Sequence, residues 1–177
     1  MLSKITKVLL IFIFFLISCY LIYTNEKVTE HNNTINQNFI DKRKSENVVG
    51  KILIDKININ RNLYDINDSN NDVNKNITIL KGSIDPKYDN SIFFLAAHSG
   101  SGEIAYFNDL NKLEKGDLIT LLYNDIKYEY IVYNKWETNK DGDIEVPKEN
   151  KKQLILTTCS TKDKHKQLII NCIEKES

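Results

Sequence analysis

The segment Gln153–Thr161, QLILTTCST, joins an apolar run to two threonines and a cysteine. An apolar run of this length that contains β-branched residues is typical of a buried strand. Cys159 is therefore predicted to lie at the end of the strand, where its side chain can leave the core and meet a substrate. A cysteine in an apolar strand is more often a small buried hydrophobic residue, so this segment alone does not indicate a nucleophile.

A second segment, Ile92–Gly102, has the same organisation, with the sequence IFFLAAHSGSG. It predicts a core strand that delivers His98 into a Ser/Gly loop. Of the three histidines and three cysteines, only His98 and Cys159 both follow a long apolar strand and precede a polar loop. A thiol and an imidazole presented in this way are the parts of a cysteine nucleophile and its acid/base partner.

Four segments between about residues 50 and 174 resemble the sortase family of cysteine transpeptidases. Their order, and the separation of the histidine from the cysteine, also fit that family. One departure is Asp55, which stands where sortases commonly have a proline. The segments are Leu156–Cys159, similar to the signature Thr-Leu-x-Thr-Cys; Leu95–Gly100, similar to the histidine segment; Lys51–Ile59, similar to the first strand; and Tyr106–Ile119, similar to the stretch after the histidine.

The resemblance implies a mainly β fold, a closed mixed barrel of about eight strands with one or two short helices. Short apolar segments separated by turn signals favour a small barrel or sandwich on their own. Alternating isoleucines in Ile52–Ile59 predict one strand with a bulge at Asp55–Lys56, and Asn124–Asp125 predicts a two-residue hairpin turn. Asn67–Asn76 is expected to be a polar loop. The other expected strands are Ile77–Leu80, Ile92–Ala97, Leu118–Tyr123, Ile126–Tyr133, the cysteine strand and Leu168–Ile173.

The N-terminal region predicts a membrane anchor. Ile5–Tyr23 is almost wholly apolar and long enough to cross a bilayer as a helix. Lys4 and Lys7 favour a cytoplasmic N-terminus, which predicts a single-pass protein of the cell membrane with an extracellular C-terminal domain. Leu16–Cys19 resembles a bacterial lipobox and offers an alternative, a lipid-modified Cys19. The apolar run continues beyond this cysteine, which favours the uncleaved anchor.

The expected organisation is a cytoplasmic tip and transmembrane anchor at residues 1–24, a polar linker at 25–49 and a catalytic domain at 50–177. The linker has too little apolar surface to offset the entropy of ordering. The formal net charge is zero, which gives no electrostatic footprint for nucleic acid. No cofactor and no metal site are predicted. Acidic loop residues could bind calcium, as in some sortases, but their spacing does not require it; these are Asp85, Asp89 and Glu103.

The cysteine pattern does not predict a disulfide framework. Cys19 lies in the expected anchor, so only Cys159 and Cys172 belong to the expected domain. Cys172 lies on the final predicted strand and is expected to be a small core or wall residue.

The resemblance implies a transpeptidation reaction. The Cys159 thiolate would attack the threonine carbonyl of an LPxTG-like sorting signal on a surface protein of a Gram-positive bacterium. A thioester would form, and an amine of a peptidoglycan precursor or a pilin lysine would resolve it. His98 would stabilise the thiolate as imidazolium and protonate the departing amine.

One part of the family's site is missing. Sortases carry an arginine at the start of the last strand, but this chain has only Arg43 and Arg61, and neither follows Cys159. The hydrophobic register places Gln167 at that position, and a slip of one residue would place Lys166 there. Strand alternation predicts that Gln167 faces the groove of the cysteine. Neither side chain reproduces the planar, permanently charged fork of arginine.

Two other functions stay open at this point. The same Cys/His pair could serve a secreted cysteine peptidase, although in such enzymes the cysteine commonly precedes the histidine in the chain. The missing arginine is also compatible with a membrane-tethered, non-catalytic binding domain on a sortase-like scaffold.

Overall fold

The computed structural model describes residues 18, 20, 27, 47–140 and 144–176. The chain divides into two units, residues 1–45 and 46–177. Apart from residues 18 and 20, the predicted anchor at residues 5–23 lies outside the described residues, as does most of the predicted linker. Within the described part of the chain, no helix has both the length and the apolar character needed to span a bilayer.

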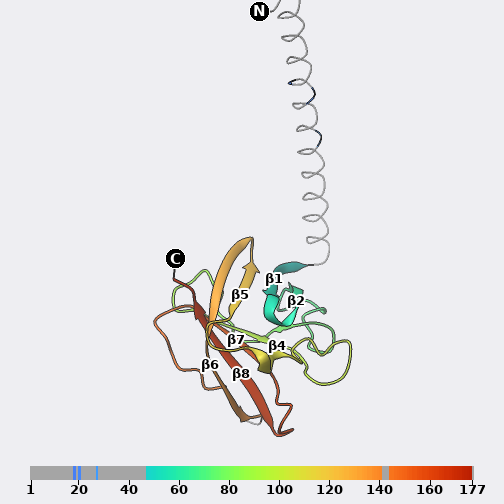
Figure 1. The fold of residues 1–177 in the computed structure, drawn as a ribbon, viewed down its shortest axis with the longest axis vertical. Coiled ribbons are helices and arrows are strands. Elements are labelled where there is room, and N and C mark those ends of the chain that lie inside the picture. Colours follow the sequence, from blue (N-terminus) through green and yellow to red (C-terminus); the bar gives the residue numbers. More distant parts are fainter. Residues whose placement is uncertain (1–17, 19, 21–26, 28–46, 141–143, 177) are drawn as a thin grey trace, which may run out of the picture. The chain divides into compact units, whose positions relative to one another are not determined.

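The described part of the second unit contains eight strands and two short 3-10 helices (Figure 1). The first strand begins at Val48, slightly before the expected domain start at Gly50. The strands are β1 (Val48–Ile54), β2 (Ile59–Tyr64), β3 (Thr78–Ile79), β4 (Ile92–Ala96), β5 (Leu118–Tyr123), β6 (Ile126–Asn139), β7 (Gln153–Cys159) and β8 (Lys166–Glu174), and the helices are η1 (Asp55–Ile57) and η2 (Leu110–Lys112).

All eight strands belong to one sheet with the order β2-β1-β5-β6-β8-β7-β4-β3. Among the described strands, β4 and β7 are the one parallel pair, and every other neighbour is antiparallel. The edge strands β2 and β3 contact each other, so the sheet is nearly closed. The prediction of a mainly β, mixed, eight-stranded barrel with few helices is therefore confirmed, with the closure incomplete.

The prediction of a single bulged strand over Ile52–Ile59 is wrong. The chain reverses there, because η1 separates two antiparallel strands and Ile54 pairs with Ile59. Asn58 closes the turn with φ 54° and ψ 35°, a left-handed conformation that asparagine tolerates well. The alternating isoleucines are buried on both sides of the turn, so the same pattern fits a hairpin as well as a straight strand.

The predicted hairpin between β5 and β6 is confirmed. Asn124 and Asp125 both have positive φ, 49° and 64°, as a type I′ turn requires. β6 continues to Asn139 instead of ending at Tyr133, because β8 pairs with it along its second half. This extension matters for the site, since it brings the far end of β6 next to the start of β8.

β7 lies inside the sheet, between β4 and β8, and is buried on both of its faces. Leu154 and Leu156 point into the main core, while Ile155 on the other face is equally inaccessible. A strand buried on both faces reads as a continuous apolar run, which explains the sequence of this segment. Cys172 on β8 is a core residue, as predicted, and its complete burial raises the pKa of its thiol.

Candidate functional site

Cys159 is the first exposed residue at the end of β7. Every residue from Gln153 to Thr158 is buried, whereas Cys159 is exposed and carries a free thiol. Hydroxyl groups tie this strand end to β4: Thr158 Oγ1 donates to the Ala97 carbonyl at 2.7 Å, and Ser99 Oγ donates to the Cys159 carbonyl at 2.7 Å. Cys159 is therefore held on well-anchored backbone while its side chain is exposed.

His98 follows β4 at the neighbouring strand end. In the parallel register Ala96 pairs with Thr157, and the amide of Ala97 donates to the Thr157 carbonyl at 3.3 Å. Two further residues along both strands bring the chain to His98 and Cys159. The register therefore carries the backbone to His98 and Cys159 at adjacent strand ends.

The imidazole of His98 is half-buried and has a defined partner. Its Nε2 lies 3.2 Å from the side-chain oxygen of Asn74, in the loop between β2 and β3. The His98 carbonyl accepts the amide of Phe107 at 3.0 Å, which fixes the backbone after the strand. Asn74 was not among the sequence-predicted site residues, because nothing distinguishes it from the other asparagines of a polar loop.

Gln167 lies directly opposite Cys159 in the antiparallel register of β7 and β8. Residues paired in this way share a face, so Gln167 emerges on the same side of the sheet as the thiol. Its Oε1 accepts the Thr157 hydroxyl at 3.4 Å, and its Nε2 donates to the Asn139 carbonyl at 3.2 Å. Lys166 belongs to the opposite face by alternation.

His165 lies in the exposed turn before β8. Its amide donates to the Asp163 carboxylate at 2.9 Å, and its carbonyl accepts the amide of Lys140 at 3.0 Å. These are backbone contacts that shape the turn.

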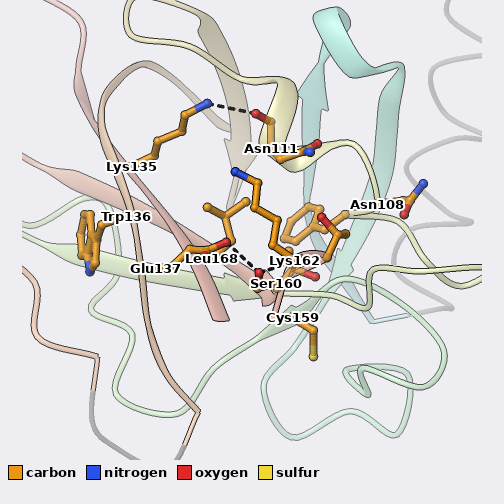
Figure 2. A pocket seen from close by; sticks show the side chains of 12 residues that line it. Asn108, Asn111, Lys135, Trp136, Glu137, Cys159, Ser160, Lys162 and Leu168 are labelled. Atoms are coloured by element: carbon orange, nitrogen blue, oxygen red, sulfur yellow. Dashed lines mark hydrogen bonds between the residues drawn. The ribbon is translucent and has the colours of Figure 1, made fainter. Parts of the chain in front are cut away.

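A cavity of about 240 Å³ adjoins Cys159 (Figure 2). Ser160 Oγ donates to the Glu137 carboxylate at 2.7 Å within it, and Lys135 Nζ donates to the Asn111 carbonyl at 3.0 Å. Figure 2 shows the Cys159 sulfur pointing away from Glu137 and Lys162. The lining of the cavity comprises Phe107, Asn108, Asn111, Lys135, Trp136, Glu137, Thr158, Cys159, Ser160, Thr161, Lys162 and Leu168.

The sequence did not indicate the residues that hydrogen-bond to the Gln167 side chain. Asn139 contacts Gln167 only because β6 runs farther than its apolar pattern indicates. Thr157 reaches the same amide from the cysteine strand. No local sequence signal identifies such contacts, since the partners are brought together by strand pairing.

Comparison with known proteins agrees with this geometry. The family model described as the sortase domain matches residues 52–174. The chain is 28% identical over 132 residues to sortase A of Bacillus anthracis, a match that spans 74% of this chain and 60% of that protein.

Two solved structures have the same fold and moderate sequence identity. Sortase C1 of Streptococcus agalactiae superposes with a TM-score of 0.64 at 28% identity, over 74% of this chain and 69% of the other. A structure of Clostridium perfringens sortase C with the C-terminal cell wall sorting motif gives a TM-score of 0.64 at 25% identity, over 75% and 72% of the two chains. The described fold is a nearly closed, mixed barrel of eight strands with a histidine and a cysteine at adjacent strand ends. The sortase family model matches most of the chain, residues 52–174. This chain therefore belongs to the sortase family.

Proposed function

We propose that this protein is a cysteine transpeptidase that acts on surface proteins bearing a sorting signal. The observation that supports it best is the placement of His98 and Cys159 at the ends of two hydrogen-bonded parallel strands within a sortase domain. The exposed thiol is accessible to a peptide, and the buried strands behind it fix its position. Two hydrogen bonds, from the Ser99 and Thr158 hydroxyls to backbone carbonyls of the neighbouring segment, hold the two strand ends together.

The reaction proceeds in two acyl transfers. The Cys159 thiol gives its proton to His98, and the thiolate attacks the carbonyl carbon of the scissile peptide bond. The carbon–nitrogen bond breaks, His98 returns the proton to the departing amine, and a thioester with Cys159 is left. An acceptor amine then attacks the thioester and gives a proton to His98, a new amide bond forms, and the carbon–sulfur bond breaks to release the Cys159 thiolate.

An LPxTG-like sorting signal is the proposed substrate, and an amine of a peptidoglycan precursor or a pilin lysine is the proposed acceptor. The solved sortase C from Clostridium perfringens that resembles this chain was described with a C-terminal cell wall sorting motif, which supports a substrate of this class. Signal and acceptor both have to reach the exposed end of β7, where Cys159 stands.

Gln167 takes the position of the family arginine in this proposal. It shares the face of Cys159, and one hydrogen of its amide is already donated to the Asn139 carbonyl at 3.2 Å. The second hydrogen can donate to the bound signal or to the oxyanion that develops during attack. An amide carries no charge, so this donor is weaker than the guanidinium that other sortases use.

We further propose that residues 1–24 form a cytoplasmic tip and transmembrane anchor, that residues 25–49 form a linker, and that the catalytic domain acts outside the cell membrane. The apolar run at residues 5–23 and its flanking lysines support this arrangement. A membrane-tethered domain would meet secreted substrates and cell-wall precursors at the surface where both emerge.

Intact-mass spectrometry of the full chain incubated with a small library of LPxTG-like peptides tests the proposal. We expect a covalent adduct of the N-terminal peptide fragment on Cys159, which a small amine resolves into an amide product. Cys159→Ala and His98→Ala should each abolish the adduct without loss of the fold, while Cys172→Ala, which removes only the buried thiol, should retain it.

Hydrolysis that is unaffected by added amines would transfer the assignment to a cysteine peptidase. Absence of any adduct, with the thiol still reactive toward a small alkylating reagent, would indicate a non-catalytic binding domain.

A further inference from the structure

In the loop between β2 and β3, the side chain of Asn74 contacts the imidazole ring of His98, the candidate acid/base residue. Asn74 Oδ1 lies 3.2 Å from His98 Nε2, although the two residues are far apart in sequence. The loop is polar and exposed at this point, so burial of apolar surface does not explain why the contact forms. The position of Asn74 must come from hydrogen bonds within the loop.

The orientation of the Asn74 amide follows from Asp72. Asn74 Nδ2 lies 3.1 Å from Asp72 Oδ1, and the backbone amide of Asn74 donates to the same oxygen at 2.9 Å. An ionised carboxylate only accepts hydrogen bonds, so the group that faces Asp72 has to be the NH₂ of the asparagine. The oxygen of Asn74 is therefore the group that faces His98.

The rest of the loop is held at several points. The Asn71 side chain exchanges two hydrogen bonds with the backbone of Ile79, at 2.7 and 3.0 Å. The hydroxyl of Tyr106, which lies shortly after His98, donates to the Lys75 carbonyl at 3.3 Å, and the guanidinium of Arg61 stacks 4.3 Å from the Tyr106 ring centre. These contacts anchor the backbone on both sides of Asn74.

We propose that Asn74, oriented by Asp72, is a positioning residue that keeps the hydrogen of His98 on Nε2. An amide oxygen accepts only, so the nitrogen that faces it has to donate. The neutral ring then carries its lone pair on Nδ1, and Nδ1 is the atom that takes the proton of the Cys159 thiol and returns it to the departing amine. This inference rests on the proposed transpeptidase function and names the residue that sets the tautomer of its acid/base group.

The two ring nitrogens of His98 then have separate roles: Nε2 donates to Asn74, and Nδ1 exchanges the proton. Nε2–H stays bonded to Asn74 throughout the reaction, in the neutral ring and in the imidazolium alike. The ring therefore gains and loses a proton at one atom without having to turn. Without Asn74, the neutral ring is free to place its hydrogen on Nδ1, and that form cannot accept the thiol proton there.

The chain provides a matched control in the same loop. Asn67 makes the same two bonds to Asp65 that Asn74 makes to Asp72, through its backbone amide at 2.9 Å and its Nδ2 at 3.2 Å. Among the described residues, however, the Asn67 side chain has no hydrogen bond to His98 or Cys159. Replacing Asn67 therefore removes an equivalent loop contact without touching the site.

The first measurement is the acylation rate of Cys159 in the full chain, with an LPxTG-like peptide and rapid-quench mass spectrometry. We expect Asn74→Ala to lower the acylation rate constant at saturating peptide about ten-fold, the effect of losing one orienting hydrogen bond, with the peptide concentration for half-maximal rate almost unchanged. Asn67→Ala should behave as wild type. An equal loss of rate in Asn67→Ala and Asn74→Ala would show a general loop effect and overturn the inference.

The second measurement does not depend on activity. Nitrogen-15 NMR of the histidine-labelled full chain in detergent micelles reports which ring nitrogen carries the hydrogen, with His31 and His165 as references. We expect the Nε2–H form of neutral His98 in wild type and in Asn67→Ala, and a mixture of both forms in Asn74→Ala. If wild type shows no acylation, the proposed function fails and this spectrum alone decides on Asn74. An unchanged His98 spectrum in Asn74→Ala would overturn the inference.

Discussion

At the scale of single residues, the residue paired with Cys159 is a glutamine, which we propose as the donor beside the thiol. Gln167 pairs with Cys159 across β7 and β8, and its amide is shared between the Thr157 hydroxyl and the Asn139 carbonyl. Both hydrogen bonds fix the position of the Gln167 amide, which carries no charge. An arginine at this position would keep the same strand geometry and add a permanent charge with several donors.

We predict that Gln167→Ala slows acylation of Cys159 by about 10²-fold, the lower end of the range for removing one oxyanion donor. Lys166→Ala should have little effect, because Lys166 belongs to the other face of β8. Gln167→Arg should be tolerated and should raise the rate. Single-turnover acylation rates of the three variants test this. The reverse ranking of the two alanine variants would assign the role to Lys166.

At the scale of elements, one ion pair joins the turn between β1 and β2 to the start of β5. Lys56 in η1 donates to Asp117 at 2.8 Å, and the backbone amide of Glu114 donates to the same carboxylate oxygen at 2.7 Å. Burial would raise the pKa of Asp117, but the hydrogen bonds from Lys56 and Glu114 outweigh it and hold that pKa below its usual value. The ionised Asp117 carboxylate therefore links the turn between β1 and β2 to the start of β5.

This linkage predicts a pH-dependent contribution to stability. Because the pKa of Asp117 is lower in the folded chain than the usual value of 3.8, its stabilising effect is complete above that value and disappears as the pH falls through the folded pKa. Asp117→Asn should lower the Tm by a few degrees at pH 7. The difference from wild type should shrink when the pH is lowered below about 3.8.

Thermal unfolding followed by circular dichroism measures this difference. Glu114→Gln serves as the control, because the Glu114 side chain is 77% exposed and lies 3.4 Å from Lys56. We expect almost no change in its Tm. A Tm difference between Asp117→Asn and wild type that is the same at pH 3 and pH 7 would contradict the prediction.

At the scale of the whole molecule, the sortase domain carries its candidate site at an exposed strand end, and the proposed anchor would determine where that site works. The described residues contain no helix suited to crossing a membrane, and of residues 5–23 only 18 and 20 are among them. The apolar run predicts an uncleaved membrane anchor, whereas the lipobox-like Leu16–Cys19 predicts a mature chain that begins at a lipid-modified Cys19.

We predict that the full chain stays in the membrane fraction with Met1 present and Cys19 unmodified. A run of this length is sufficient for an uncleaved spanning helix. N-terminal peptide mass spectrometry of the membrane fraction measures both features. Recovery of a mature chain that begins at a diacylated Cys19 would replace the anchor by a lipid.

The sequence by itself determined the parts of this protein that local patterns encode. Apolar runs ending at Cys159 and His98 indicated two core strands with a polar group at each end, and Asn124–Asp125 specified its hairpin turn, because strand burial and turn geometry depend on neighbouring residues. The Ile52–Ile59 segment shows the limit, since the same alternation fits a bulged strand and a hairpin.

The tertiary structure alone decided which groups surround the candidate residues His98 and Gln167. Asn74 reaches His98 from a polar loop, and Asn139 reaches Gln167 because β8 extends β6 beyond its apolar pattern. Such contacts depend on pairing between strands and loops that are distant in the chain. A hydrogen bond needs only a donor and an acceptor in place, so no residue type or spacing marks it in advance.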